Sequence, residues 1–177
     1  MKSVSRLVAA VSLLALAACQ TPAPQVPAPP VPVSGALTQH QPLAPALGVT
    51  GSGPAFSIKY LSTNGVSGVG LVPVTGVVIY PAGPAPQGGW PVVAWAHGTV
   101  GVANSCAPSL NPRSTRDQTY LSEWLRRGFA IFATDYQGLG SDGPHPSLNP
   151  RSGAYSGLDG VKASHAGPPD LCQHYIP

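Results

Sequence analysis

Residues 91–109, PVVAWAHGTVGVANSCAPS, join an apolar run to a loop of small residues. The valine-rich run predicts a strand, and His97-Gly98-Thr99 follows at its end. A second apolar run, 129–134, ends at Asp135 and a glycine-rich loop. Loops at the carboxyl ends of parallel strands open onto a shared crevice. Backbone N–H groups there can stabilise the oxyanion that forms when a serine attacks a carbonyl. Both loops are therefore candidates for this chemistry.

The elements that must position these loops can be read from periodicity. Residues 75–83 and 91–97 predict strands, and 129–134 predicts another. Residues 114–127 carry an apolar stripe at helical spacing, with Ser114 as a capping residue and Gly128 at the end. A weaker helix is expected from about 152 to 164, because Gly157 and Gly160 each cost it ~1 kcal/mol. The order strand, loop, helix, strand predicts an α/β fold with parallel strands and flanking helices.

Together with YLSEWLRRGFAIFATDYQGLGSDGPHPSL, residues 91–109 resemble the secretory lipase family of the α/β-hydrolase fold. AYSGLDGVKAS resembles the helix before that family's nucleophile strand, and the match spans residues 70–164. The resemblance implies a serine hydrolase of carboxylic esters or lipids that works through an acyl-enzyme. It makes the N–H of Asp135 the first oxyanion-hole candidate, with Gly98 and Thr99 lining the same wall. The carboxylate of Asp135 could at the same time cap a turn. The side chain of His97 is expected to bond to the loop backbone and so to orient the loop, rather than to act as an acid or base.

The nucleophile of such an enzyme sits in G-x-S-x-G, and no serine in this chain has that context. Ser67 follows Gly65 but precedes Val69 by two residues, and Ser141 follows Leu139 by two. We therefore assign no catalytic residue. We expect a truncated, inactive fragment that ends before the nucleophile elbow and binds an ester or lipid substrate only if a catalytic half completes it. The alternative is a non-catalytic, membrane-anchored surface lipoprotein that acts as a binding or scaffold module.

The first eighteen residues predict a lipoprotein signal peptide. A short basic start precedes an apolar run that ends in Leu16-Ala17-Ala18-Cys19, which resembles the bacterial lipobox. Cys19 is the expected lipidation site, and Gln20 after it favours the outer membrane of a bacterial cell envelope. Residues 19–47 include a proline-rich stretch that predicts a linker, and 48–177 are expected to form the N-terminal part of the hydrolase domain.

The remaining residues exclude several classes of function. Charged residues make up 8% of the chain, and no basic stripe with interleaved aromatics suggests a nucleic-acid partner. Cys106 and Cys172 could pair in an exported protein, but they lack metal-ligand spacing, so no metal or cofactor is expected. Asp142 and Asp159 are expected to be solvated. The heptapeptide PSLNPRS occurs twice, at 108–114 and 146–152, without a longer repeat around it.

The lipobox predicts that the mature chain begins at a lipidated Cys19 and partitions with membranes. Metabolic labelling with a fatty-acid analogue should therefore label the wild-type chain and leave a Cys19→Ala variant unlabelled. Label on the Cys19→Ala variant would rule out this anchor.

Overall fold

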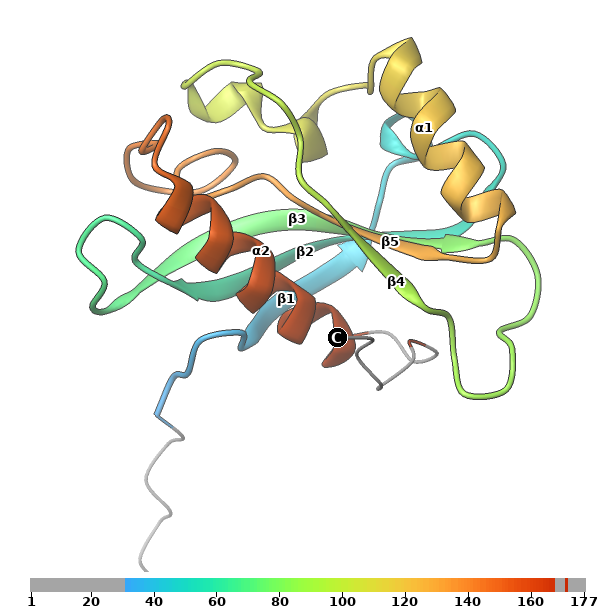
Figure 1. The fold of residues 1–177 in the computed structure, drawn as a ribbon, viewed down its shortest axis with the longest axis horizontal. Coiled ribbons are helices and arrows are strands. Elements are labelled where there is room, and N and C mark those ends of the chain that lie inside the picture. Colours follow the sequence, from blue (N-terminus) through green and yellow to red (C-terminus); the bar gives the residue numbers. More distant parts are fainter. Residues whose placement is uncertain (1–30, 168–170, 172–177) are drawn as a thin grey trace, which may run out of the picture. The chain divides into compact units, whose positions relative to one another are not determined.

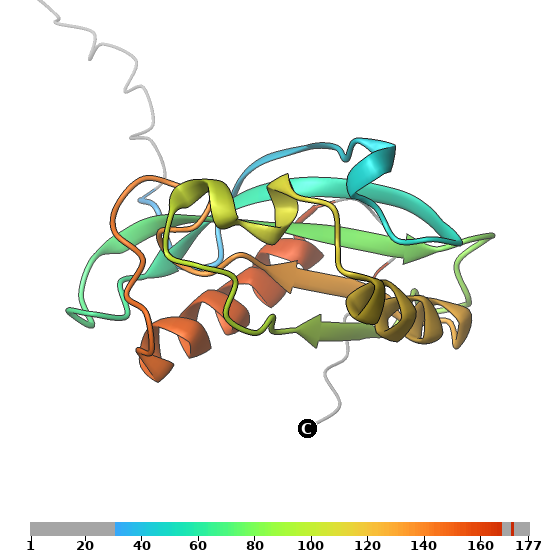
Figure 2. The ribbon, with the colours of Figure 1, turned by 90° about the horizontal axis from the view of Figure 1, so that it is seen from above.

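The computed structural model describes residues 31–167 and Leu171. Its five-stranded sheet has the order β1-β2-β3-β5-β4, which can be followed across Figure 2 to β4 at one edge. The elements along the chain are β1 (Leu37–Pro42), η1 (Pro45–Leu47), β2 (Ser52–Thr63), β3 (Leu71–Pro81), β4 (Val92–Trp95), η2 (Asn104–Cys106), η3 (Pro108–Leu110), α1 (Thr115–Arg126), β5 (Ala130–Thr134) and α2 (Pro150–His165). Here η denotes a short 3-10 helix.

The sheet is mixed. Strands β4 and β5 are parallel, with Val93 opposite Ile131, and helix α1 connects them as the sequence predicted. The pairs β1–β2, β2–β3 and β3–β5 are antiparallel. The expectation of parallel strands therefore holds for the two strands that carry the candidate loops and not for the strands before them. Strand β1 also lies inside the predicted linker 19–47, so the folded domain begins before residue 48.

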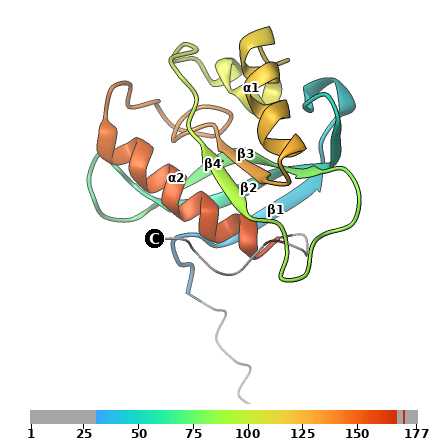
Figure 3. The same cartoon turned by 45° about the vertical axis from the view of Figure 1, so that its right-hand side comes forward.

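Two apolar layers cover the two faces of the sheet. Side chains alternate along a strand, so Val77 and Ile79 of β3 pack with Leu121 and Leu125 of α1. Their neighbours on the other face, such as Val78, belong to the cluster that includes Ala163 of α2. Figures 1 and 3 show α2 crossing in front of the strands. Since the neighbouring strands β3 and β5 contribute buried residues to both clusters, they form the centre of this core.

Both predicted helices are confirmed, and side chains cap both of them. The Ser114 hydroxyl accepts a hydrogen bond from the Asp117 N–H at the start of α1. The Asn149 side chain accepts one from the Ser152 N–H at the start of α2, where Pro150 is the first residue. Such caps satisfy N–H groups that have no partner within the helix. Among the described residues, no helix has the length and apolar character needed to cross a membrane.

Helix α2 is fixed to the sheet by buried polar groups, and one sequence expectation fails there. Asp159 is buried rather than solvated, because it accepts hydrogen bonds from the Ser62 hydroxyl, the Thr63 N–H and Lys162. Burial acts to raise the pKa of Asp159, but these bonds outweigh it and hold the pKa below its ordinary value. The Tyr60 hydroxyl also donates to the Ser156 carbonyl at 2.7 Å.

The sheet edge formed by β4 has one further contact. Leu171, beyond α2, forms an isolated parallel bridge with Trp90, just before β4 begins. Within the described residues, β4 pairs along its length only with β5. Leu171 therefore lies at the edge of the sheet beside the start of β4.

The two glycines of α2 predict opposite stability changes. A Cβ at Gly160 would lie 2.1 Å from Cζ of Phe132, whereas one at Gly157 would meet nothing within 4 Å. Gly157→Ala should stabilise the protein by up to ~1 kcal/mol through helix propensity. Gly160→Ala should destabilise it, since overpacking costs ~1–3 kcal/mol. Urea unfolding of both variants measures the difference, and equal stabilisation by both would contradict this packing.

Candidate active site

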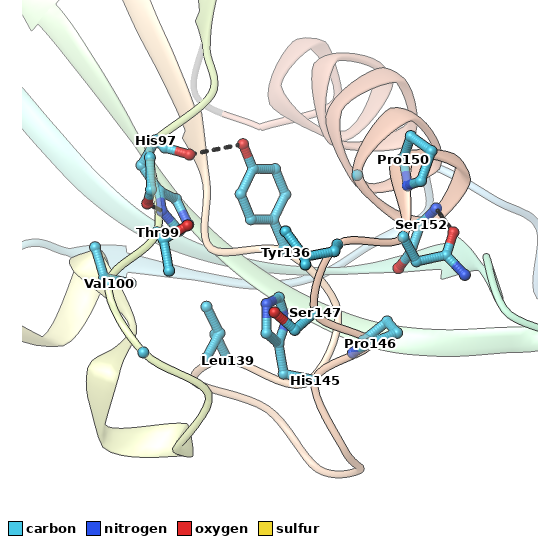
Figure 4. A pocket seen from close by; sticks show the side chains of 15 residues that line it. His97, Thr99, Val100, Tyr136, Leu139, His145, Pro146, Ser147, Pro150 and Ser152 are labelled. Atoms are coloured by element: carbon cyan, nitrogen blue, oxygen red, sulfur yellow. Dashed lines mark hydrogen bonds between the residues drawn. The ribbon is translucent and has the colours of Figure 1, made fainter.

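A cavity of about 380 Å³ lies where β4 and β5 end. One wall is the segment after β4, from His97 to Gly101, and the floor includes Tyr136 and Leu139. The opposite wall runs from His145 to Gly153, at the start of α2 (Figure 4). The sequence placed Gly98 and Thr99 at such a crevice, and both line it. Asp135 is not among the lining residues.

The wall formed by 98–101 carries backbone donors without acceptors. Within the described part of the chain, the N–H groups of Gly98, Thr99, Val100 and Gly101 make no hydrogen bond to backbone or side chain. Gly101 has a φ of +120°, and a Cβ there would lie 2.6 Å from Sγ of Cys106, so the turn favours glycine. The loop can therefore offer several N–H donors to a negatively charged oxygen in the cavity.

His97 connects this wall to the end of β5. Its Nδ1 lies 2.6 Å from the Gly98 carbonyl oxygen, and its Nε2 lies 3.3 Å from that of Asp135. Carbonyl oxygens only accept, so each contact needs an N–H on the ring, and a neutral imidazole supplies one at a time. Both ring nitrogens face backbone carbonyl oxygens, so neither of them points into the cavity as a base. These contacts suit a residue that orients the loop, and that role stays a prediction.

Asp135 lies behind the cavity, and its predicted role must be corrected. Its N–H donates to the Thr75 carbonyl at 2.8 Å, as part of the contact between β5 and β3. That N–H is therefore not available to an oxyanion. The buried carboxylate accepts from the Ser109 N–H at 2.9 Å and lies 2.7 Å from the Thr75 hydroxyl. Burial raises the pKa of Asp135, and the bonds from Ser109 and Thr75 offset only part of that effect.

Tyr136 is a site residue that sequence reasoning missed. It has a φ of +69°, a left-handed conformation that is uncommon outside glycine and recurs at functional sites. Its ring lies 4.4 Å from the His97 ring, and its hydroxyl donates to the His97 carbonyl oxygen at 3.1 Å. Figure 4 shows this bond across the cavity. The sequence signal was the position directly after a buried strand and before a glycine-rich loop.

His145 was also missed, and it lies on the facing wall. Its Nδ1 donates to the Gln137 carbonyl oxygen at 2.8 Å. A carbonyl accepts only, so Nδ1 carries the proton and Nε2 of the neutral ring is an acceptor. No hydrogen bond to Nε2 forms within the described residues. Like Ser147 and Leu139, this residue lines the cavity (Figure 4). The sequence signal was a histidine between two prolines next to a glycine-rich loop.

Among the described serines, none has the environment of an activated nucleophile. Ser67 lies in an exposed loop and donates to the Val69 carbonyl, and Ser141 is buried with no partner for its hydroxyl. Ser147 and Ser152 line the cavity, but Ser152 donates to the Gln137 side chain. Between described residues, no serine hydroxyl bonds to a histidine.

The predicted cysteine sites are only partly described by the structure. Cys106 is a free, partly buried thiol beside the 98–101 wall. Its proposed partner Cys172 and the lipidation site Cys19 lie outside the described residues. No cluster of His, Cys, Asp or Glu that could hold a metal occurs within 31–167 or at Leu171.

Solved structures with a similar fold are lipases and esterases. Lipase A of Candida antarctica is 19% identical with a TM-score of 0.50, over 76% of this chain and 32% of its own. The ligand-bound rice cell wall degrading esterase LipA of Xanthomonas oryzae is 19% identical with a TM-score of 0.55, over 76% of this chain and 38% of its own. The G231F mutant of that esterase is 20% identical with a TM-score of 0.54, and its coverage is the same.

These likenesses show that the chain has part of the α/β-hydrolase fold, to which the lipases and esterases belong. The chain spans less than two-fifths of the length of each of these structures. No family model matches the sequence, and no curated protein matches it.

The raised pKa of Asp135 predicts a pH-dependent stability difference. The folded protein keeps this proton at pH values where the unfolded chain has lost it, so the carboxyl's contribution to stability falls as pH rises from about 4. Asp135→Asn does not titrate and can retain both hydrogen bonds. Chemical unfolding at pH 4 and pH 7 gives the free energy of unfolding of both proteins. The stability of the variant relative to that of wild type should be higher at pH 7 than at pH 4. Asp142→Asn, at an exposed position, controls for lost charge. A difference that shrinks with pH would contradict the assignment.

Proposed function

We propose that this chain supplies the oxyanion-stabilising and substrate-binding part of a serine hydrolase that cleaves carboxylic esters or lipids. The observation that carries the proposal is the set of free N–H groups at 98–101 on the wall of the cavity. The likeness to lipases and esterases supports the same chemistry. The proposed oxyanion donors are the backbone N–H groups of Gly98, Thr99, Val100 and Gly101. The N–H of Asp135 is not among them, because it donates to the Thr75 carbonyl.

The reaction places negative charge on one oxygen. A serine hydroxyl attacks the ester carbonyl, its proton passes to a base, and the carbonyl oxygen becomes an oxyanion in a tetrahedral intermediate. Collapse of the intermediate expels the alcohol and leaves an acyl-enzyme, which water then hydrolyses. Preorganised N–H donors lower the barrier to both steps, with losses of ~2.7–4 kcal/mol seen when one donor is removed. His97 and Tyr136 would hold the loop in place, since their tilted rings are in contact and the Tyr136 hydroxyl donates to the His97 carbonyl.

The rim of the cavity fits an apolar acyl or alcohol group. Leu148 is 94% exposed and Val100 is 45% exposed, and they lie on opposite walls. A substrate chain placed between them would cover apolar surface that is otherwise in water. Ester or lipid substrates are therefore the class that the proposal assigns.

The nucleophile is proposed to come from outside these 177 residues, because none of their serines stands in G-x-S-x-G. The free edge of β4 is the place for a further parallel strand, and Leu171 already bridges to Trp90 in that direction. A strand paired there would end beside the 98–101 wall, since parallel neighbours end at the same side of the sheet. On this proposal the chain alone is inactive and needs a catalytic half.

A second candidate is a non-catalytic lipoprotein of the bacterial envelope, anchored through Cys19 and using the domain as a binding or scaffold module. The absent nucleophile motif and the lipobox favour it. Both candidates place the domain at a membrane surface, with the outer membrane as the proposed location. They differ in whether a second segment restores turnover.

The proposal predicts that the purified 177-residue chain hydrolyses a nitrophenyl acyl ester at a rate near the buffer background. A fluorophosphonate probe should label no serine, since the described residues pair no serine with a base. Initial rates at several protein concentrations give the measurement, with Ser67→Ala and Ser141→Ala as matched variants. A rate proportional to protein that one of these variants abolishes, with labelling of that serine, would overturn the missing-nucleophile account.

A further inference from the structure

The repeated heptapeptide PSLNPRS has a counterpart in space. Its first copy, 108–114, lines a cavity of about 550 Å³, and its second, 146–152, lines the candidate active site. The segment 97–100 lines both cavities and so forms the wall they share. Each copy also leads into a helix, α1 after the first and α2 within the second. Identical sequences therefore border the two sides of one loop.

The arginines of the two copies differ in their hydrogen bonds. Arg151, in the second copy, donates from Nε to the Gly65 carbonyl at 2.6 Å and from Nη2 to the Val66 carbonyl. Arg113, in the first copy, has all three guanidinium nitrogens buried and no acceptor among the described residues. The same heptapeptide thus presents one arginine with backbone acceptors and one without them.

No carboxylate of the described residues forms an ion pair with Arg113, although Asp135 and Asp117 favour its charged form from a longer distance. Its guanidinium carbon lies 5.3 Å from the centre of the Trp95 ring, and no carboxylate of the described residues lies within 4.0 Å of its nitrogens. Asp135 already binds Ser109 and Thr75 with its two oxygens, and Asp117 pairs with Arg116 at 3.3 Å. Burial lowers the pKa of Arg113. A buried cation without a partner is costly, because it loses hydration without a compensating bond.

We propose that the cavity beside Arg113 binds the carboxylate of a small organic acid with an apolar body. A single uncompensated guanidinium matches one monoanion, and its planar fork suits the two oxygens of a carboxylate. Asn111 and Ser105 line the same cavity and provide polar groups, while Trp95, Val100 and Pro108 provide apolar surface. This site is separate from the ester site and does not depend on the proposed hydrolase activity.

Binding includes a movement of the arginine. Each guanidinium nitrogen is covered in the free protein, although Arg113 lines the cavity. The acid therefore draws the guanidinium away from the Trp95 ring and toward the cavity. This movement gives the site its own signal, since the environment of the Trp95 indole changes when the cation leaves its face.

Benzoate and its neutral isostere benzamide test the proposal directly. Titrations followed by ¹⁵N–¹H NMR should show saturable benzoate binding with a shift of the Trp95 indole N–H, and no saturable effect of benzamide. Arg113→Gln should weaken benzoate binding at least about tenfold, because it removes a charge-assisted hydrogen bond. Arg151→Gln is the matched control from the other heptapeptide and should bind benzoate as wild type does. Equal binding of benzamide, or undiminished binding by Arg113→Gln, would overturn the proposal.

Thermal unfolding provides a second test that does not depend on detecting a weak complex. Without ligand, Arg113→Gln should melt at a temperature equal to or above that of wild type, because it removes an uncompensated buried charge. Benzoate should raise the melting temperature of wild type and of Arg151→Gln but not of Arg113→Gln. A marked loss of stability in ligand-free Arg113→Gln would show that the guanidinium is a structural group, and the site would be rejected.

Discussion

The buried carboxyl group of Asp135 joins the segments that surround both cavities. One oxygen holds the Ser109 N–H of η3, and the other holds the Thr75 hydroxyl of β3, which also lies 3.1 Å from the Leu139 carbonyl. The backbone carbonyl of the same residue contacts His97, and its N–H pairs with β3. Since burial without these bonds would be costly for a carboxyl, the segments keep their places together. His97 contacts both the Gly98 carbonyl of the candidate oxyanion loop and the backbone carbonyl of Asp135, and so lies between the two.

The elements near the candidate site could be predicted because their signals are local. Ser114 caps α1, and the apolar run of β5 is buried on both faces, as its composition indicated. The antiparallel half of the sheet was harder to predict. Strand β1, LTQHQP, is mostly polar and exposed, so it carries no apolar alternation, and its place depends on pairing with β2.

Only the site residues that directly follow a predicted strand could be placed from the sequence. Gly98 and Thr99 lie on the cavity because they directly follow a strand, which is a local property. The role of Asp135 could not be read in this way, since Thr75, its N–H acceptor, is sixty positions earlier in the chain. Asp159 was misjudged for the same reason, because Ser62 and Thr63 approach it only in the folded protein. The environments of Asp135 and Asp159 depend on residues that are distant in the sequence, and hydrophobic periodicity does not predict such contacts.

The most direct test of the central claim is binding of a tetrahedral oxyanion mimic to the 98–101 wall. Butylphosphonate carries the required geometry and charge, and amide NMR resolves the individual N–H groups. The account predicts saturable shifts at Gly98, Thr99, Val100 and Gly101, and no shift at Asp135 that exceeds those of the surrounding strand. A Thr99→Pro variant, which lacks one donor, should bind more weakly. Shifts confined to other surfaces, or binding unaffected by Thr99→Pro, would contradict the claim that this loop is an oxyanion site.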